Sequence, residues 1–301
     1  MKCKKCKQPA IIALRRHNAA FCREHYLEYF YGQVERAVKE YRMFARDDRI
    51  LVAVSGGKDS LALWDVLLTL GYRADGLYID LGIDGYSERS KEKVLYFARE
   101  RGANLRIASI KEEYGLGIRE LARKARRAAC SVCGLHKRYL FNREAMEGEY
   151  DAIATGHNLD DEAATLLGNL LNWNTGYLAR QSPLLEATAA NLVKKVKPLY
   201  RLTEREIASY AVLRRVDYIV EECPMAVGAK SILYKNVLNQ LEEVSPGTKA
   251  RFLFGFLEEG RQVFAGEKEE VALKACALCG QPTTAEVCSR CRTLRRAGVT
   301  L

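Results

Sequence analysis

The sequence lacks any long hydrophobic run. No apolar stretch in the 301 residues approaches the roughly 20 residues that a membrane span needs, so we expect no membrane association. The start of the chain, MKCKKC, is basic and has no apolar core of the kind found in secretory signal peptides. Internal repeats and low-complexity segments are absent as well. These absences predict a folded, cytoplasmic protein.

The charge balance is strongly basic. The net charge is +10 and the isoelectric point about 9.1. A surface rich in Lys and Arg favours nucleic acid, because each neutralised phosphate releases counterions. Simple solubility remains the alternative explanation of the charge.

Ten cysteines fall into three groups, and none is left over. In a reducing cytoplasm such groups indicate metal binding or catalysis rather than disulfides. The members are Cys3, Cys6 and Cys22; Cys130, Cys133 and Cys223; and Cys276, Cys279, Cys288 and Cys291.

Apolar runs alternate with helical patterns through the middle of the chain. This alternation predicts an α/β fold with a doubly wound parallel sheet, whose ligands bind at the carboxyl ends of the strands. We expect strands over 49–54, 74–81, 104–110 and 150–154. We expect helices over 26–46, 61–68, 87–101, 135–146, 159–171, 204–215, 230–243 and 247–260, and a loop over 172–200.

A glycine-containing loop, Ser55-Gly56-Gly57-Lys58-Asp59-Ser60, lies between the first expected strand and helix. Its glycines allow the backbone to approach a polyphosphate, and the N–H groups of the following helix point toward that anion. Lys58 and the Ser55 and Ser60 hydroxyls add donors, and Asp59 can bind Mg²⁺. The loop differs from the longer Walker A pattern. It matches the SGGxDS loop of enzymes that split ATP into AMP and pyrophosphate, and such enzymes adenylate a carbonyl oxygen.

Two outer groups have the spacing of zinc ligands. Cys3-x2-Cys6, fifteen further residues and Cys22-x2-His25 predict a site of three thiolates and one imidazole, with His17 as the alternative imidazole. At the other end, Cys276-x2-Cys279, eight residues and Cys288-x2-Cys291 predict a four-thiolate site. Because both sets are complete, we expect structural Zn²⁺.

Both outer groups are surrounded by basic residues that are candidates for binding RNA phosphates. They are Lys2, Lys4, Lys5, Lys7, Arg15 and Arg16 at the start, and Arg290, Arg292, Arg295 and Arg296 at the end. The alternative is that the zinc only stabilises small termini without a core of their own.

The central group has three cysteines and no fourth ligand nearby. Three thiolates favour a [4Fe–4S] cluster with one open iron at Cys130, Cys133 and Cys223. A cysteine pair that carries a persulfide, or three buried core cysteines, are the alternatives.

Further charged residues are candidates for a role in the reaction or in RNA binding. Lys137 follows Cys133 and can stabilise charge near the ATP phosphates, unless it is an ordinary solvated lysine. Asp161 opens a helix, where it suits the helix dipole, but it can also bind Mg²⁺ or act near the reacting base. The basic stretch 119–127 is a candidate tRNA contact or a solvated face.

Together these motifs resemble the TtcA/TtuA family of tRNA thiolation enzymes, most closely its members that thiolate (5-methyl)uridine 54. The resemblance extends over essentially the whole chain and includes 156–161 and Cys223-Pro224. It implies a homodimer, tRNA as substrate, and sulfur delivered by the thiocarboxylate tail of a ubiquitin-like carrier protein. It also implies ATP contacts at Ala53, Val54, Ser55, Asp59, Ile79, Lys137 and Gly156.

We therefore expect four segments: an N-terminal zinc finger over 1–30, a connecting helix over 31–48, a catalytic domain with the iron–sulfur site over 49–265, and a C-terminal zinc finger over 270–301. The expected reaction adenylates O2 of the uridine and replaces that oxygen by sulfur. Alternatives are thiolation of uridine 34 or cytidine 32, a persulfide thiolase without a cluster, a ligase of the tRNA-lysidine type, and a non-catalytic RNA-binding adaptor.

Overall fold

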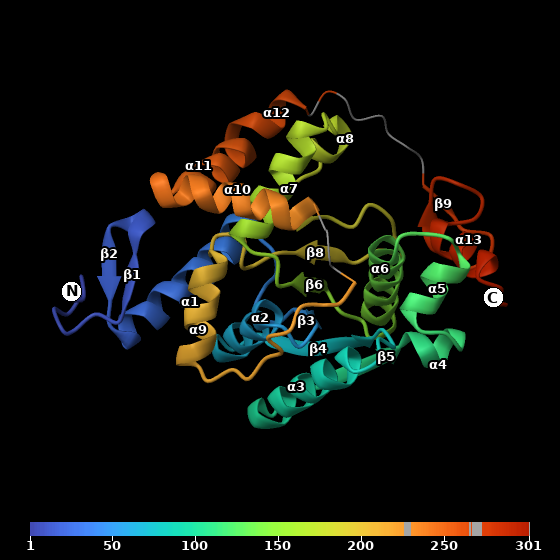
Figure 1. The fold of residues 1–301 in the computed structure, drawn as a ribbon, viewed down its shortest axis with the longest axis horizontal. Coiled ribbons are helices and arrows are strands. Elements are labelled where there is room, and N and C mark those ends of the chain that lie inside the picture. Colours follow the sequence, from blue (N-terminus) through green and yellow to red (C-terminus); the bar gives the residue numbers. More distant parts are fainter. Residues whose placement is uncertain (226–229, 265, 267–272, 301) are drawn as a thin grey trace.

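A six-stranded sheet forms the centre of the molecule (Figure 1). The computed structural model describes residues 1–225, 230–264, 266 and 273–300. The strand order is β5-β4-β3-β6-β8-β7, and only β7 runs antiparallel to its neighbour. The strands are β3 (Arg49–Val54), β4 (Arg73–Asp80), β5 (Leu105–Ser109), β6 (Ala152–Thr155), β7 (Leu184–Leu185) and β8 (Lys194–Val196). The expected doubly wound sheet is confirmed.

The chain reverses its direction of winding between β3 and β6. Helices α2 (Lys58–Thr69) and α3 (Tyr86–Arg101) connect β3, β4 and β5, after which α4 (Ile110–Tyr114), α5 (Ile118–Lys124) and α6 (Ala129–Glu147) return the chain to β6 on the other side of β3. In open α/β sheets this reversal opens a crevice at the carboxyl ends of the two strands. Both Ser55–Ser60 and Gly156–Asp161 lie there.

The apolar run of β3 is buried on both faces of the sheet. Ile50, Val52 and Val54 pack into a core with α1 (Arg23–Glu40), α2 and α9 (Glu204–Leu213), whereas Leu51 packs into a second core with α5 and α6. A strand covered on both faces reads as a continuous apolar run, which is why the sequence predicts it well.

The remaining helices of the sheet domain lie between β6 and β7 or after β8. They are α7 (Leu159–Leu171), α8 (Thr175–Leu178), α9 (Glu204–Leu213), α10 (Lys230–Val244), α11 (Thr248–Gly255), a π-helical turn (Phe256–Gly260) and α12 (Arg261–Val263). Helix α10 lies beside α7 in Figure 1. None of the helices in the described part of the chain is long and apolar enough to cross a membrane.

Several expected elements differ from the structure, and the helices α4 and α5 were not expected. The loop expected over 172–200 contains α8, β7 and β8, which are too short to show a periodic pattern. The helix expected from 135 begins earlier, at Ala129. The sequence did not predict this start because no side chain caps the N-terminus of the helix. The helix expected over 26–46 is α1 (Arg23–Glu40), and it ends just before Arg42, which has a positive φ.

Two small cysteine-containing modules lie at opposite ends of the molecule (Figure 1). The N-terminal module has β1 (Ile12–Leu14), a 3-10 turn (Arg15–His17) and β2 (Ala19–Phe21), and continues into α1 without a break at residue 30. The C-terminal module has β9 (Lys274–Ala275), β10 (Pro282–Thr283) and α13 (Ser289–Arg296). Residues 265 and 270, which bound the expected catalytic and C-terminal segments, lie outside the described residues.

Arg290 attaches the C-terminal module to the sheet domain. Its guanidinium lies 3.5 Å from the ring centroid of Tyr139 and donates to the Tyr114 hydroxyl over 2.6 Å. The side chain is only 6% exposed. The expectation that Arg290 contacts RNA is therefore wrong, because cation–π and hydrogen-bond contacts with α4 and α6 occupy it.

Arg16 attaches the N-terminal module in the same way. Its guanidinium donates to Glu206 over 2.7 Å and to the Arg201 carbonyl over 2.9 Å, and the two charged side chains are 7% and 3% exposed. A buried guanidinium in this position cannot also neutralise an RNA phosphate. The expected RNA contact at Arg16 is wrong for the same reason as that at Arg290.

Replacing Arg16 by Met is expected to lower the free energy of unfolding by about 3 to 5 kcal/mol, because it leaves the buried Glu206 carboxylate without its partner. Thermal denaturation measures the loss. The neighbouring Arg15, which is exposed, provides the control: Arg15→Met should change stability by no more than about 0.5 kcal/mol. Equal losses in both variants would contradict the buried pair.

Candidate active site and metal centres

The Ser55–Ser60 loop has a tightly constrained backbone. Gly56 has φ of +79°, and a Cβ added there would lie 2.7 Å from the Ser90 carbonyl oxygen. The Ser60 hydroxyl accepts from the Ser55 N–H over 3.1 Å and donates to the Gly57 carbonyl over 3.0 Å. The loop is therefore held in shape by contacts within the protein, with the N-terminus of α2 behind it.

The segment after β6 packs directly on this loop. A Cβ at Gly156 would lie 2.9 Å from the Asp59 carbonyl carbon and from the Ser60 nitrogen. Asn158 is fully buried, and its amide donates to the Asp59 carboxylate over 3.3 Å. Asn158 also caps α7 in a reciprocal capping box with Asp161. The two expected motifs thus form one site.

A cavity of about 450 Å³ opens at this point. It has the size of a small-ligand site. Its lining includes most of the residues expected to bind ATP, namely Ala53, Val54, Ser55, Gly57, Asp59, Ser60, Ile79, Lys137, Gly156 and Asp161. Cys133 and Cys223 belong to the same wall.

Two expected ATP-binding residues are placed differently. Gly56 and Lys58 do not belong to the cavity lining. Gly56 shapes the loop from behind, where its carbonyl accepts from the Ile219 N–H over 2.9 Å. Lys58 Nζ lies 2.6 Å from Glu204 and 3.1 Å from Asp59, so two carboxylates hold its charge in this structure.

The central cysteines approach one another from distant parts of the chain. Cys130 and Cys133 lie in the first turns of α6, and Cys223 lies after α9. The Cys130 thiol donates to the Met225 carbonyl over 3.0 Å, which brings α6 against the Cys223 segment. Burial raises the pKa of the Cys133 thiol above its ordinary value, and nearby Lys137 partly offsets this effect.

These three cysteines suit a cluster better than a single ion. Among the described residues, two groups of four place their ligand atoms within 4.8 Å of one another, and Cys130, Cys133 and Cys223 are not among them. A four-iron cluster is wider than one ion, so it takes thiolates that stand further apart. Three thiolate donors beside a nucleotide-sized cavity fit such a cluster.

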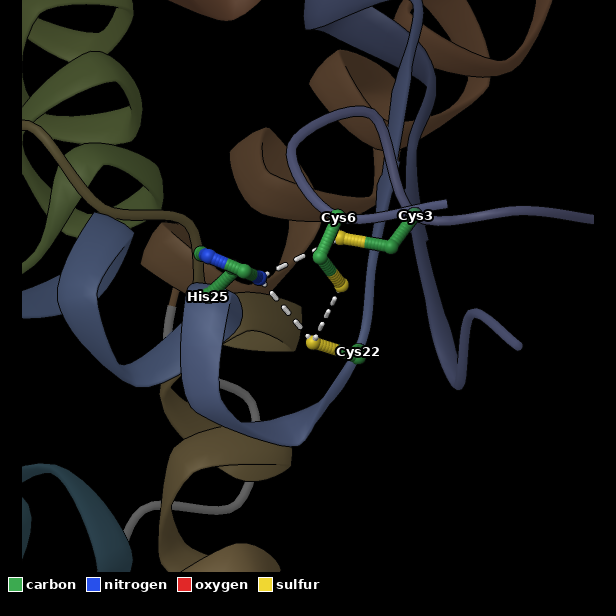
Figure 2. A group of neighbouring side chains, drawn as sticks. All are labelled: Cys3, Cys6, Cys22 and His25. Carbon is green, nitrogen blue, oxygen red and sulfur yellow. Dashed lines mark hydrogen bonds between the residues drawn. The ribbon is translucent and has the colours of Figure 1, made fainter. Parts of the chain in front are cut away.

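The N-terminal group has the geometry of a closed tetrahedral site (Figure 2). A tetrahedron with Zn–S bonds of about 2.3 Å has edges of about 3.8 Å. The Cys6 and Cys22 sulfurs lie 3.7 Å apart, and His25 Nδ1 lies 3.5 Å from Cys3 Sγ and 3.2 Å from Cys22 Sγ. His17 instead contacts the Tyr29 hydroxyl over 3.0 Å, so His25 is the imidazole of this group.

The C-terminal group is equally compact. Its four sulfurs converge, and the Cys279 and Cys288 sulfurs lie 3.7 Å apart. The Cys276 sulfur accepts from the Cys288 N–H over 3.2 Å. Burial acts to raise the pKa of Cys276, but backbone N–H donors outweigh it and lower that pKa to about 6. A thiol that ionises this readily is suited to bind a metal.

Several residues at this site were not expected from the sequence. Tyr86 and Phe141 line the cavity beside His157 of the expected 156–161 motif, and Glu204 and Lys235 hold its charged groups from behind. Of the unexpected residues, only Glu204 lies at a position that the sequence marks, because the capping box between Thr203 and Glu206 predicts the start of α9 there. Nothing near Lys235 in the sequence indicates a role.

Comparison with known proteins agrees with this geometry. Residues 29–226 match the PP-loop domain, and residues 2–27 match the N-terminal LIM domain of 2-thiouridine synthetase TtuA. The chain is similar to tRNA-5-methyluridine(54) 2-sulfurtransferases. It is 55% identical to that of Thermus thermophilus (97% of this chain, 90% of the relative) and 48% identical to that of Pyrococcus horikoshii (97% and 93%).

A solved structure shares the fold. The U34-tRNA thiolase NcsA from Methanococcus maripaludis, described with its [4Fe-4S] cluster, superposes with a TM-score of 0.81 at 23% identity, over 98% of this chain and 96% of that one. At this identity the likeness supports the fold alone. The sequence matches extend further, and with them the chain belongs to the TtcA/TtuA family of PP-loop tRNA sulfurtransferases.

Proposed function

We propose that this protein replaces the C2 oxygen of (5-methyl)uridine 54 in tRNA by sulfur at the expense of ATP. The observation that carries the proposal is the shared cavity, in which the Ser55–Ser60 loop faces Cys133 and Cys223. The reaction requires the uridine oxygen that ATP activates and the sulfur that replaces it to come together in one site. The named activity of relatives up to 55% identical supports uridine 54 as the target.

The first step activates the base. Loop N–H groups and the Ser55 and Ser60 hydroxyls bind the ATP phosphates, while Asp59 and Asp161 bind Mg²⁺. The uridine O2 attacks the α-phosphate and pyrophosphate leaves, so the poor leaving group becomes an AMP ester. Lys137 stabilises the negative charge that develops beside the cavity wall.

The second step introduces sulfur at C2 and expels AMP. A [4Fe–4S] cluster bound by three protein thiolates would supply an open iron able to bind sulfide. Cys130, Cys133 and Cys223 would bind it, at the wall of the cavity where the base is activated. Each of the two outer groups of four ligands would hold a structural Zn²⁺, because four protein ligands leave no open position.

Several partners follow from the family. We propose tRNA, a ubiquitin-like carrier protein that delivers sulfur as a thiocarboxylate, and a second copy of the chain. The net charge of +10 supports tRNA binding, as do exposed residues on and after α5, including Arg119, Arg123 and Arg126. Arg127 is partly buried and donates to Thr293 of α13 over 2.9 Å and to Ser131 of α6 over 3.3 Å, so it joins these two helices instead.

Protein purified without oxygen and supplied with Mg-ATP, sulfide and tRNA tests the proposal. Mass spectrometry of mapped tRNA fragments should find 2-thiolation at uridine 54 and equimolar pyrophosphate release. Sulfur at uridine 34 or cytidine 32 would assign the chain to a different substrate. Thiolation without ATP consumption would refute the mechanism, and full activity of iron-free protein would favour a persulfide instead.

A further inference from the structure

A chain of alternating charges lies behind the cavity wall. Its first half is centred on Lys58, whose ammonium lies 3.1 Å from Asp59 Oδ2 and 2.6 Å from Glu204 Oε1. Burial raises the pKa of Asp59 above its ordinary value, Lys58 opposes that rise, and the negative charges of Asp161 and Glu204 add to it. Glu204, at the start of α9, is thereby tied to the nucleotide loop.

The second half is centred on Lys235 of α10. Its ammonium lies 2.5 Å from Asp161 Oδ1 and 3.4 Å from Glu204 Oε2. Burial acts to lower the pKa of Lys235, but Asp161 and Glu204 outweigh it, and the net effect is a raised pKa. Lys235 therefore remains charged, and its side chain is 25% exposed.

Asn158 closes the two halves into a ring. Its N–H donates to Asp161 Oδ2 over 3.1 Å, and its side-chain amide donates to Asp59 Oδ1 over 3.3 Å. Each ring member contacts the next, in the order Asp59, Lys58, Glu204, Lys235, Asp161 and Asn158. Such a closed network fixes the orientation of its carboxylates, because moving one breaks contacts on both sides.

Only some members of the ring line the cavity. Asp59 and Asp161 line the cavity, whereas Lys58, Glu204 and Lys235 do not. Lys235 also comes from a helix whose remaining surface is largely solvent-exposed, including Leu233 and Leu241. Lys235 is partly exposed and pairs with a carboxylate that lines the cavity, which suits a role in positioning that carboxylate rather than a role in a core.

We propose that Lys235 is a positioning residue that holds the Asp161 carboxylate toward Mg-ATP, with Glu204 holding Lys235 and Lys58 in place. The inference rests on the proposed function, because it takes Asp161 as a group that acts on the nucleotide complex. Partners that orient ligand groups from behind typically contribute 10- to 100-fold to metal affinity or activity. Lys235 fills this position for Asp161.

The test compares three variants of the full-length protein. Lys235→Met removes the charge, Lys235→Arg keeps it, and Lys230→Met removes an exposed lysine from the same helix. Calorimetry measures binding of α,β-methylene-ATP, an analogue that cannot release pyrophosphate, over a range of Mg²⁺ concentrations. Thermal denaturation and zinc content verify that each variant is folded.

We expect Lys235→Met to raise the half-saturating Mg²⁺ concentration by 10-fold or more, Lys235→Arg to restore most of the affinity, and Lys230→Met to match wild type. Unchanged Mg²⁺ dependence in Lys235→Met would overturn the inference. So would equal defects in the Met and Arg variants. These binding results are independent of thiolation: if wild type binds the analogue but never thiolates tRNA, the proposed function fails while the role of Lys235 stands.

Discussion

Replacing Cys133 by Ser is expected to abolish tRNA thiolation, with a loss of at least about 1,000-fold. The hydroxyl is a poor ligand for iron, and Cys133 contributes to the cavity wall where sulfur must meet the activated base. Nucleotide binding should persist, because the Ser55–Ser60 loop does not depend on this thiol. Thiolation is measured by nucleoside mass spectrometry, and iron and zinc by elemental analysis.

The control for Cys133→Ser is Ser131→Ala, which alters an exposed side chain in the same turn of α6. It should retain iron and activity. Cys133→Ser should lose iron but keep two zinc ions per chain, because both outer ligand groups lie at the ends of the molecule. Normal thiolation by Cys133→Ser would contradict the proposed centre.

Replacing Gly56 by Ala should reduce ATP affinity by about 10-fold or more, because backbone strain and a steric clash displace the loop. The φ of +79° alone costs an L-residue about 1 to 2 kcal/mol. In addition, the new Cβ would lie 2.7 Å from the Ser90 carbonyl oxygen, so the loop must move away from α3. That movement displaces the N–H groups that bind phosphate, and calorimetric titration with ATP measures the loss.

The variant Gly71→Ala is the control for Gly56→Ala, because it introduces backbone strain without a steric clash. Gly71 also has φ of +79°, but nothing lies within 4 Å of a Cβ added there. Gly71→Ala should therefore lose about 1 kcal/mol of stability and bind ATP normally. If both alanine variants bound ATP equally well, the close approach between Gly56 and Ser90 would have no part in shaping the site.

Local spacing is what made the metal and nucleotide sites predictable. The ligands Cys3, Cys6, Cys22 and His25 form two close pairs, and the 55–60 loop is a contiguous hexamer between a strand and a helix. Such patterns carry their chemistry within a few residues. The fold was predictable for a similar reason, because strands such as β3 are buried on both faces and contain uninterrupted apolar residues.

Long-range pairing is what the sequence could not reveal. Arg16 resembles the other basic residues of its module in sequence. In the structure it is buried in an ion pair with Glu206, which lies 190 positions further along the chain. Lys235 meets Asp161 only because α10 lies beside α7. The strands β7 and β8 were missed for another reason: with two and three residues, they are too short for a side-chain period to appear.

The strand order of the central sheet limits how two molecules can associate. One outer strand, β7, has two residues, and the other, β5, carries Arg106, whose guanidinium bonds to Glu144 over 2.9 Å. A very short edge strand and an edge strand with a charged side chain are both poor templates for pairing with a strand of another molecule. Crowded copies of this protein are therefore protected against growth into extended intermolecular sheets through the central sheet.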